Sequence, residues 1–210
     1  MKRVYLILKS MFIALLLSQN AIAYADAIEG KHYDKVKNNF YEESLGVEKF
    51  FSLTCGPCWK VSTMLPSISK QSQQTIHKTH VVFDKVTRAA ATLYYSAEIQ
   101  FEKLNLKAKS KFTNELFMLV QKSRKIENVN VTDLFRRYQL TPISQLTKEQ
   151  QAKVNTQLAR SEKLTAQATI MQIPSIIVNG TYQVNMRPHK SISELSETIK
   201  YLANLKDSMS

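Results

Sequence analysis

Cys55 and Cys58 are the only cysteines of this 210-residue chain, and Gly56 and Pro57 separate them in the stretch FSLTCGPCWK. A disulfide between residues three positions apart closes a very short loop, so it removes little entropy from the unfolded chain. Zinc in a structural site needs four ligands, and none of the four histidines has a usual ligand spacing to this pair. The pair is therefore predicted to be redox-active, with neither a structural nor a metal-binding role.

The residues on either side of the pair predict a strand that runs into a helix. Residues 47–52 fit a buried strand, because Phe50 and Phe51 place apolar bulk on both faces. Apolar residues that follow share one side of a helix: Trp59, Val61, Met64 and Leu65. Cys55 would then lie at a helix N-terminus, where free N–H groups and a partial positive charge stabilise a thiolate.

The rest of the chain predicts a mixed α/β sheet that is interrupted by helices. A strand is expected at residues 80–83, and the Asn179-Gly180 pair predicts a hairpin between strands at 175–178 and 181–185. Helical patterns occupy 89–104, 111–122, 132–138, 147–170 and 191–205. Residues 84–173 are accordingly expected to be a helical insertion.

The N-terminus has the pattern of a signal peptide. Three basic residues precede or flank an apolar run at residues 11–17, and small residues follow it. We expect cleavage after Ala25; the alternative, an uncleaved anchor, has a run that is too short to span a bilayer. Export would place the cysteines in an oxidising environment.

The chain is basic, with a net charge of +12 that falls to +9 without the predicted signal. The lysines and arginines are scattered over predicted helices, which indicates a generally solvated basic surface. Export argues against nucleic acid as a partner.

Three motifs lie in order along the chain: EGKHY at 29–33, FFSLTCGPC at 50–58 and IPSIIVNGTYQVN at 173–185. On these motifs the mature chain resembles the DsbA family of bacterial periplasmic thiol-disulfide oxidoreductases. The resemblance implies a thioredoxin fold made of residues 26–83 and 174–210, with an inserted helical domain at 84–173. It also implies a cis peptide bond between Ile173 and Pro174, which would lie against the cysteine pair and dock an extended substrate.

The resemblance further implies an enzyme whose catalytic residues are Cys55 and Cys58, without a metal or any cofactor besides their disulfide. Its partners would be exported proteins with free thiols or disulfides and a quinone-linked membrane reoxidant similar to DsbB. We expect a monomer in the periplasm.

Two departures from the family pattern bear on mechanism. Gly56-Pro57 is the pair found in thioredoxins, which act as reductants, whereas the DsbA type usually has Pro-His. Lys49 occupies the place where the family commonly has a buried glutamate, and Glu48 should point to the opposite face of the strand. The alternatives are that Lys49 lies beneath the active site or that a shifted strand puts Glu48 there.

The function expected from the sequence is a thiol oxidase that introduces disulfide bonds into exported proteins. One alternative uses the same chemistry in the opposite direction, as a periplasmic reductase or isomerase. Another is a binding or chaperone-like module that has no exchange activity.

Overall fold

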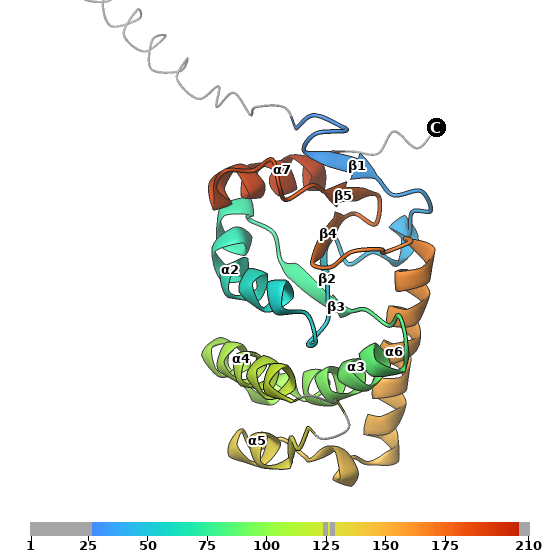
Figure 1. Cartoon of the computed structure of the whole chain (residues 1–210), viewed down its shortest axis with the longest axis vertical. Coiled ribbons are helices and arrows are strands. Elements are labelled where there is room, and N and C mark those ends of the chain that lie inside the picture. Colours follow the sequence, from blue (N-terminus) through green and yellow to red (C-terminus); the bar gives the residue numbers. More distant parts are fainter. Residues whose placement is uncertain (1–26, 124–125, 127–128, 206–210) are drawn as a thin grey trace, which may run out of the picture.

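The computed structural model describes residues 27–123, 126 and 129–205, so the predicted signal peptide at 1–25 lies outside the described residues. Five strands form one sheet in the order β1-β5-β4-β2-β3 (Figure 1). Their bounds are β1 Tyr33–Lys35, β2 Val47–Phe51, β3 Ile76–His80, β4 Ser175–Val178 and β5 Tyr182–Val184. Only β2 and β3 pair in parallel, and the other neighbours are antiparallel.

The hairpin between β4 and β5 turns at Asn179 and Gly180, as predicted. Both residues have positive φ, 51° and 64°, as a two-residue turn of this kind requires. A Cβ atom on Gly180 would lie 2.7 Å from the carbonyl carbon of Phe40. Glycine is therefore required here both by the backbone conformation and by close contact with the Phe40 backbone.

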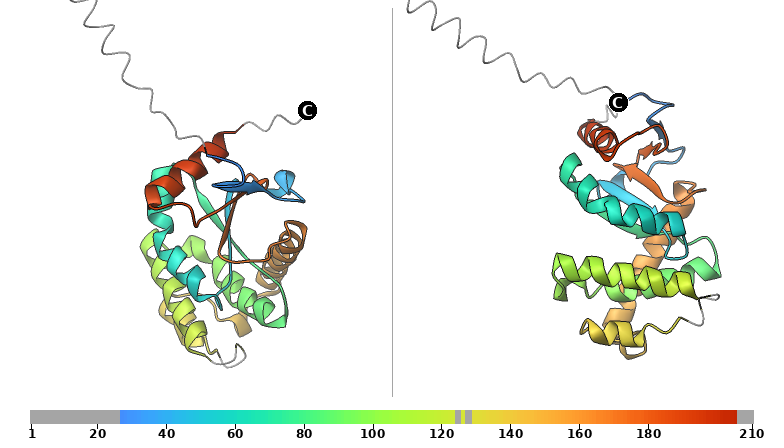
Figure 2. Two further views of the ribbon diagram at one scale, coloured as in Figure 1. Left: turned by 45° about the horizontal axis from the view of Figure 1, so that its top comes forward. Right: turned by 60° about the vertical axis from the view of Figure 1, so that its left-hand side comes forward.

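Helices cover both faces of the sheet. The helices α2 (Gly56–Ser72) and α7 (Ile192–Asn204) lie side by side on one face (Figure 2). The end of α6 (Lys148–Gln167) lies against the other face, where Leu164 packs with Phe50 and Ile177. Both faces of β2 are consequently buried, so its two charged residues, Glu48 and Lys49, need polar partners inside the protein.

The segment between β3 and β4 forms a helical block at one end of the sheet (Figure 1). It contains α3 (Lys85–Glu98), α4 (Leu106–Lys122), α5 (Thr132–Arg137) and most of α6, with short 3-10 helices η2 (Phe101–Lys103) and η4 (Ile143–Gln145). The ring of Phe51, at the end of β2, lies 5.0 Å from that of Tyr94 and 5.8 Å from that of Phe117. One aromatic core thus joins the block to the strand that leads to Cys55.

Each predicted helical segment contains a helix, but α3 and α4 begin earlier than the apolar pattern indicated, and α3 ends at Glu98 where the prediction continued to residue 104. Asp84 caps α3 through a capping box with Thr87, and the Asn105 side chain accepts a hydrogen bond from the N–H of Ala108 at the start of α4. These caps are local polar contacts that hydrophobic periodicity does not contain. No helix of the described ranges is long and apolar enough to cross a membrane.

The prediction of a strand at residues 80–83 was wrong, because β3 is Ile76–His80. The apolar run after His80 retains one sheet hydrogen bond, from the N–H of Val81 to the carbonyl of Phe51. The strand itself is polar: Thr79 donates to the carboxylate of Glu48 on β2, and the charge of Glu98 on α3 acts on Lys78. The limits of the two predicted domains, 26–83 with 174–210 and 84–173, stay predictions.

Candidate active site

The two cysteines are joined in a disulfide at the N-terminus of α2. Cys55 is the residue that caps the helix, and its sulfur accepts a hydrogen bond of 3.0 Å from the N–H of Cys58. Cys55 is partly exposed, whereas Cys58 is completely buried. Only one of the two sulfurs is therefore open to attack from solvent, and this sulfur lies at the positive end of the helix.

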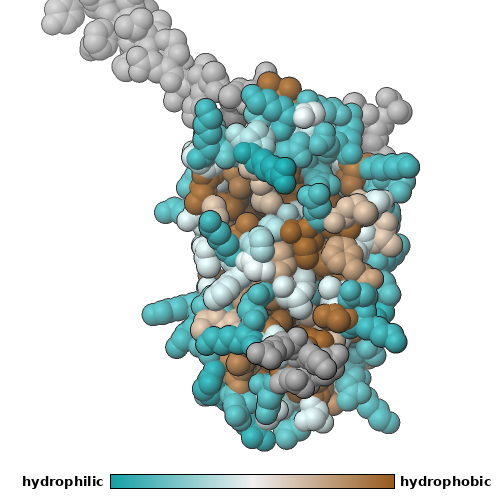
Figure 3. Space-filling view, viewed as in Figure 1, coloured by the Kyte–Doolittle hydropathy of each residue, from teal (hydrophilic) through white to brown (hydrophobic). Residues whose placement is uncertain are grey.

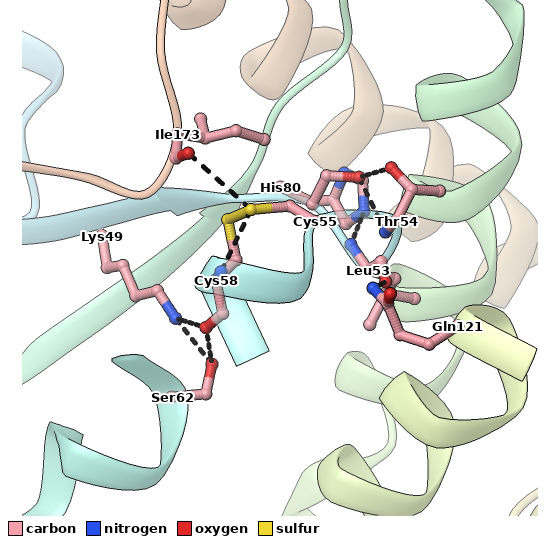
Figure 4. Close-up of a disulfide and its surroundings, with 10 residues drawn as sticks. Lys49, Leu53, Thr54, Cys55, Cys58, Ser62, His80, Gln121 and Ile173 are labelled. Atoms are coloured by element: carbon pink, nitrogen blue, oxygen red, sulfur yellow. Dashed lines mark hydrogen bonds between the residues drawn. A yellow bond between two sulfur atoms is a disulfide. The ribbon is translucent and has the colours of Figure 1, made fainter. Parts of the chain in front are cut away.

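The loop before β4 closes over this pair, although it lies 118 residues further along the chain. The Ile173-Pro174 peptide bond is cis, as the family resemblance implied. The carbonyl oxygen of Ile173 lies 3.7 Å from the sulfur of Cys55 (Figure 4). Gly56 and Pro57 are exposed in the first turn of α2. The predicted active-site loops thus lie together.

The turn before Cys55 is held by hydrogen bonds to both backbone polar groups of Leu53. Its N–H donates to Nε2 of His80 at 3.0 Å, and its carbonyl accepts from the side-chain amide of Gln121 in α4 at 2.7 Å (Figure 4). Burial lowers the pKa of His80 to about 4, so the ring is neutral. Since Nε2 accepts, the proton is on Nδ1, where it donates to the carbonyl of Val81 at 2.9 Å.

Lys49 lies beneath the pair, on the face of β2 that α2 covers. Its side chain is completely buried, and Nζ donates to the carbonyl of Cys58 at 2.9 Å and to the hydroxyl of Ser62 at 2.6 Å (Figure 4). The same nitrogen lies 5.2 Å from the centre of the Phe51 ring. Burial, followed by the positive charge of Lys78, lowers the pKa of Lys49 to about 7.

Glu48 points to the opposite face of the sheet, toward α6. Its carboxylate forms a salt bridge of 3.0 Å with Arg160 and accepts from the hydroxyl of Thr79 at 2.8 Å. It also accepts from the N–H of Leu45. The alternation of side chains predicted this separation, and of the two alternatives the structure has Lys49 beneath the active site.

Sequence reasoning missed three residues that hold the site: Ser62, His80 and Gln121. Ser62 could have been found, because it lies four residues after Cys58 and therefore on the same side of the predicted helix. His80 and Gln121 reach Leu53 from distant segments, and no local pattern signals such contacts.

Apolar side chains gather in the middle of the face shown in Figure 3, with polar side chains around them. Met171, two residues before Ile173, is 81% exposed, and Phe83, three residues after β3, is 47% exposed. Large apolar residues that are this exposed are typical of interaction surfaces when they gather in a patch.

The sequence matches no known family model and no curated protein. Solved structures match over nearly the whole described chain. The disulfide oxidoreductase DsbA from Proteus mirabilis shares 16% identity, with 87% of this chain and 97% of that one covered and a TM-score of 0.61. Reduced DsbA1 from Neisseria meningitidis shares 21% identity over 85% and 94% of the chains, with a TM-score of 0.62.

DsbL from Salmonella enterica serovar Typhimurium shares 14% identity and has a TM-score of 0.68. The match covers 87% of this chain and 100% of that one. The chain has the DsbA fold. A further structure of the Proteus protein is a complex with a non-covalently bound peptide. These likenesses confirm the predicted thioredoxin fold with a helical insertion. Within the described ranges, no three histidine, cysteine or acidic side chains are grouped as metal ligands would be.

Proposed function

We propose that this protein is a thiol-disulfide oxidoreductase that introduces disulfide bonds into exported proteins. The observation that carries the proposal is the Cys55–Cys58 disulfide, with one partly exposed sulfur at a helix N-terminus against the cis bond before Pro174. Its occurrence in a DsbA fold supports the same chemistry. Catalysis needs no cofactor besides this disulfide.

The reaction is two successive exchanges at sulfur. A substrate thiolate attacks the sulfur of Cys55, the Cys55–Cys58 bond breaks, and Cys58 leaves as a thiolate. A second substrate thiolate then attacks the substrate sulfur of the mixed disulfide, and Cys55 leaves as a thiolate. Two electrons pass from the substrate dithiol to the protein. Attack falls on Cys55 because Cys58 is completely buried.

Lys49 is proposed to act as the acid-base partner of Cys58. In the reverse direction Cys58 must lose its proton before it can attack a mixed disulfide at Cys55. The amine of Lys49 is hydrogen-bonded to the carbonyl of Cys58, and its pKa of about 7 makes it a proton acceptor near neutral pH. Glu48 is paired with Arg160 on the other face and is not proposed to take part.

Substrates are proposed to dock at the loop before β4 as extended segments. The backbone of Ile173 lies beside Cys55, and the exposed side chain of Met171, two residues earlier in the chain, offers an apolar contact. We propose that the protein works in the periplasm as a monomer, and that a quinone-linked membrane partner similar to DsbB reoxidises it.

A reductase or isomerase is the second candidate, and the Gly56-Pro57 dipeptide favours it. Thioredoxin and DsbA reduction potentials differ by about 150 mV, which is roughly 7 kcal/mol for two electrons. The thioredoxin-like dipeptide should make this protein a weaker oxidant than a typical DsbA. Oxidation of substrates is still feasible, because the periplasm is kept oxidising kinetically.

Two assays test the proposal. The oxidised protein should form a disulfide in a reduced peptide with two cysteines, and the reduced protein should accelerate insulin reduction only weakly. Fast insulin reduction with slow peptide oxidation would favour the reductase, and the absence of both activities would leave only a binding module. Equilibration with glutathione buffers is expected to give a potential between those of thioredoxin and DsbA.

Replacing Gly56-Pro57 with Pro-His should make the protein more oxidising. A histidine beside the sulfur of Cys55 stabilises its thiolate, and therefore the reduced form, by its dipole or charge. The shift should appear as a larger reduced fraction in the same glutathione buffers. An unchanged potential would mean that other residues control the redox balance.

A further inference from the structure

Two lysines lie side by side beneath the active site. Lys49 in β2 and Lys78 in β3 are direct partners in the parallel register, so their side chains leave the same face of the sheet. Lys49 is completely buried and Lys78 is half-buried. Like charges at opposed sheet positions are destabilising, and burial increases that cost. The pair is tolerable if one of the two amines is uncharged.

Neither lysine has an ion-pair partner within 4.0 Å among the described residues. The negative charge that raises the pKa of Lys78 is that of Glu98, at the end of α3. Its carboxylate accepts a hydrogen bond of 2.7 Å from Tyr94, whose ring packs edge-on against Phe51 at 5.0 Å. Because Phe51 also faces the amine of Lys49, the charged groups are connected through one packed layer.

The neighbouring charges act on the pKa values of the two lysines in opposite directions. Burial lowers the pKa of both, but at Lys49 the positive charge of Lys78 adds to the lowering, whereas at Lys78 the charge of Glu98 opposes it. Burial raises the pKa of Glu98 to about 7, against the effects of Tyr94, Lys78 and Arg160 of α6. His80 on β3, whose ring lies 5.1 Å from that of Phe51, is neutral, and Cys58 on α2 carries no proton to titrate while the disulfide is closed.

We propose that Lys78 is a positioning residue whose positive charge keeps Lys49 uncharged, and that Glu98 maintains the positive charge of Lys78. This inference rests on the proposed function, because it explains how Lys49 stays available as a base. When a mixed disulfide is resolved, the thiol of Cys58 gives its proton to Nζ of Lys49. The Cys58 thiolate then attacks the sulfur of Cys55, the Cys55–Cys58 bond forms, and the substrate leaves as a thiolate.

The charge state of Lys49 can be measured directly in the oxidised protein, by NMR titration of its side-chain carbon next to Nζ. Lys78→Met should raise the titration midpoint of Lys49 by on the order of one pH unit, because it removes the neighbouring cation. Lys78→Arg keeps the charge and should leave the midpoint low. Glu98→Gln should lower it further at pH values where Glu98 is ionised.

Lys70→Met is the matched control, since Lys70 is exposed in the last turn of α2, and it should not move the midpoint. In exchange assays, the pH at which resolution is half-maximal should rise in Lys78→Met. In a Lys49→Met background the Lys78 substitution should have no further effect on the pH profile. A merely structural role of Lys78 would change stability without shifting either midpoint.

The inference is overturned if Lys49 titrates at the same pH in Lys78→Met, Lys78→Arg and the unmodified protein. The proposed function fails separately, if the unmodified protein forms no mixed disulfides with a thiol peptide. The NMR titration needs no exchange activity, so the two failures can be told apart.

Discussion

Replacing Cys55 with serine should reduce thiol-disulfide exchange to the uncatalysed rate. Its sulfur is the only one of the pair that solvent reaches, and buried Cys58 cannot be attacked by a folded substrate in its place. The loss should appear in both directions, as failure to oxidise a reduced peptide and failure to reduce insulin. The fold should persist, since a disulfide that closes so short a loop adds little stability.

Cys58→Ser should instead trap mixed disulfides. Cys55 would still form a bond with the substrate sulfur, but no internal thiol would remain to resolve it. The adducts can be counted by mass spectrometry after incubation with a disulfide-containing peptide, and reductant should release them. A variant with both serines is the control and should trap nothing. Equal trapping by the two single variants would contradict the assignment of Cys55 as the attacked sulfur and Cys58 as the resolving thiol.

The site at Cys55 and Cys58 could be predicted because its signals are local. A strand, a short turn and a helix follow one another within residues 47–65, so the position of Cys55 at the helix N-terminus follows from periodicity alone. The Asn179-Gly180 hairpin is equally local, since its turn type depends on two adjacent residues. The cis bond before Pro174 came only from the family resemblance, because an X-Pro pair permits cis without requiring it.

The position of β3 could not be predicted, since its register depends on side chains from other elements. Thr79 is buried because it donates to Glu48, and Lys78 is half-buried beside Lys49 and under the influence of Glu98. In the sequence alone these polar residues do not indicate a buried strand, whereas the apolar run after His80 does. Packing partners that are distant in sequence override the local pattern here.

The face that Lys49 occupies was also beyond local reasoning. Alternation requires Lys49 and Glu48 to point to opposite faces, but it does not say which face α2 covers. The choice is fixed by acceptors and charges on other elements: the Cys58 carbonyl and Ser62 for the lysine, and Arg160 for the glutamate.

Lys49→Met should stabilise the protein and slow its chemistry. The folded-state pKa of about 7 lies below the ordinary lysine value of 10.5, so charging this amine opposes folding. At about 1.4 kcal/mol per pKa unit, the free energy of unfolding should rise by roughly 5 kcal/mol below pH 7. The unfolded chain binds the extra proton between pH 7 and 10.5, so the gain should fade across that window. Urea unfolding at several pH values measures it.

Glu48→Gln provides the matched comparison, because it changes the neighbouring residue on the other face of the same strand. It leaves Arg160 without its buried carboxylate partner and should lower stability by about 3 kcal/mol, the opposite sign to Lys49→Met. Resolution of a mixed disulfide at Cys55 should nevertheless keep its rate and pH profile in Glu48→Gln.

In Lys49→Met the same resolution step should be slower, and its pH dependence near neutrality should be lost, because no amine accepts the proton of Cys58. Stability and rate then change in opposite senses in the lysine variant, so a general loosening of the fold cannot account for the slower step. If Glu48→Gln slowed resolution and Lys49→Met left it unchanged, the lysine would be a buried structural residue, and a carboxylate on the far side of the sheet would have to serve Cys58.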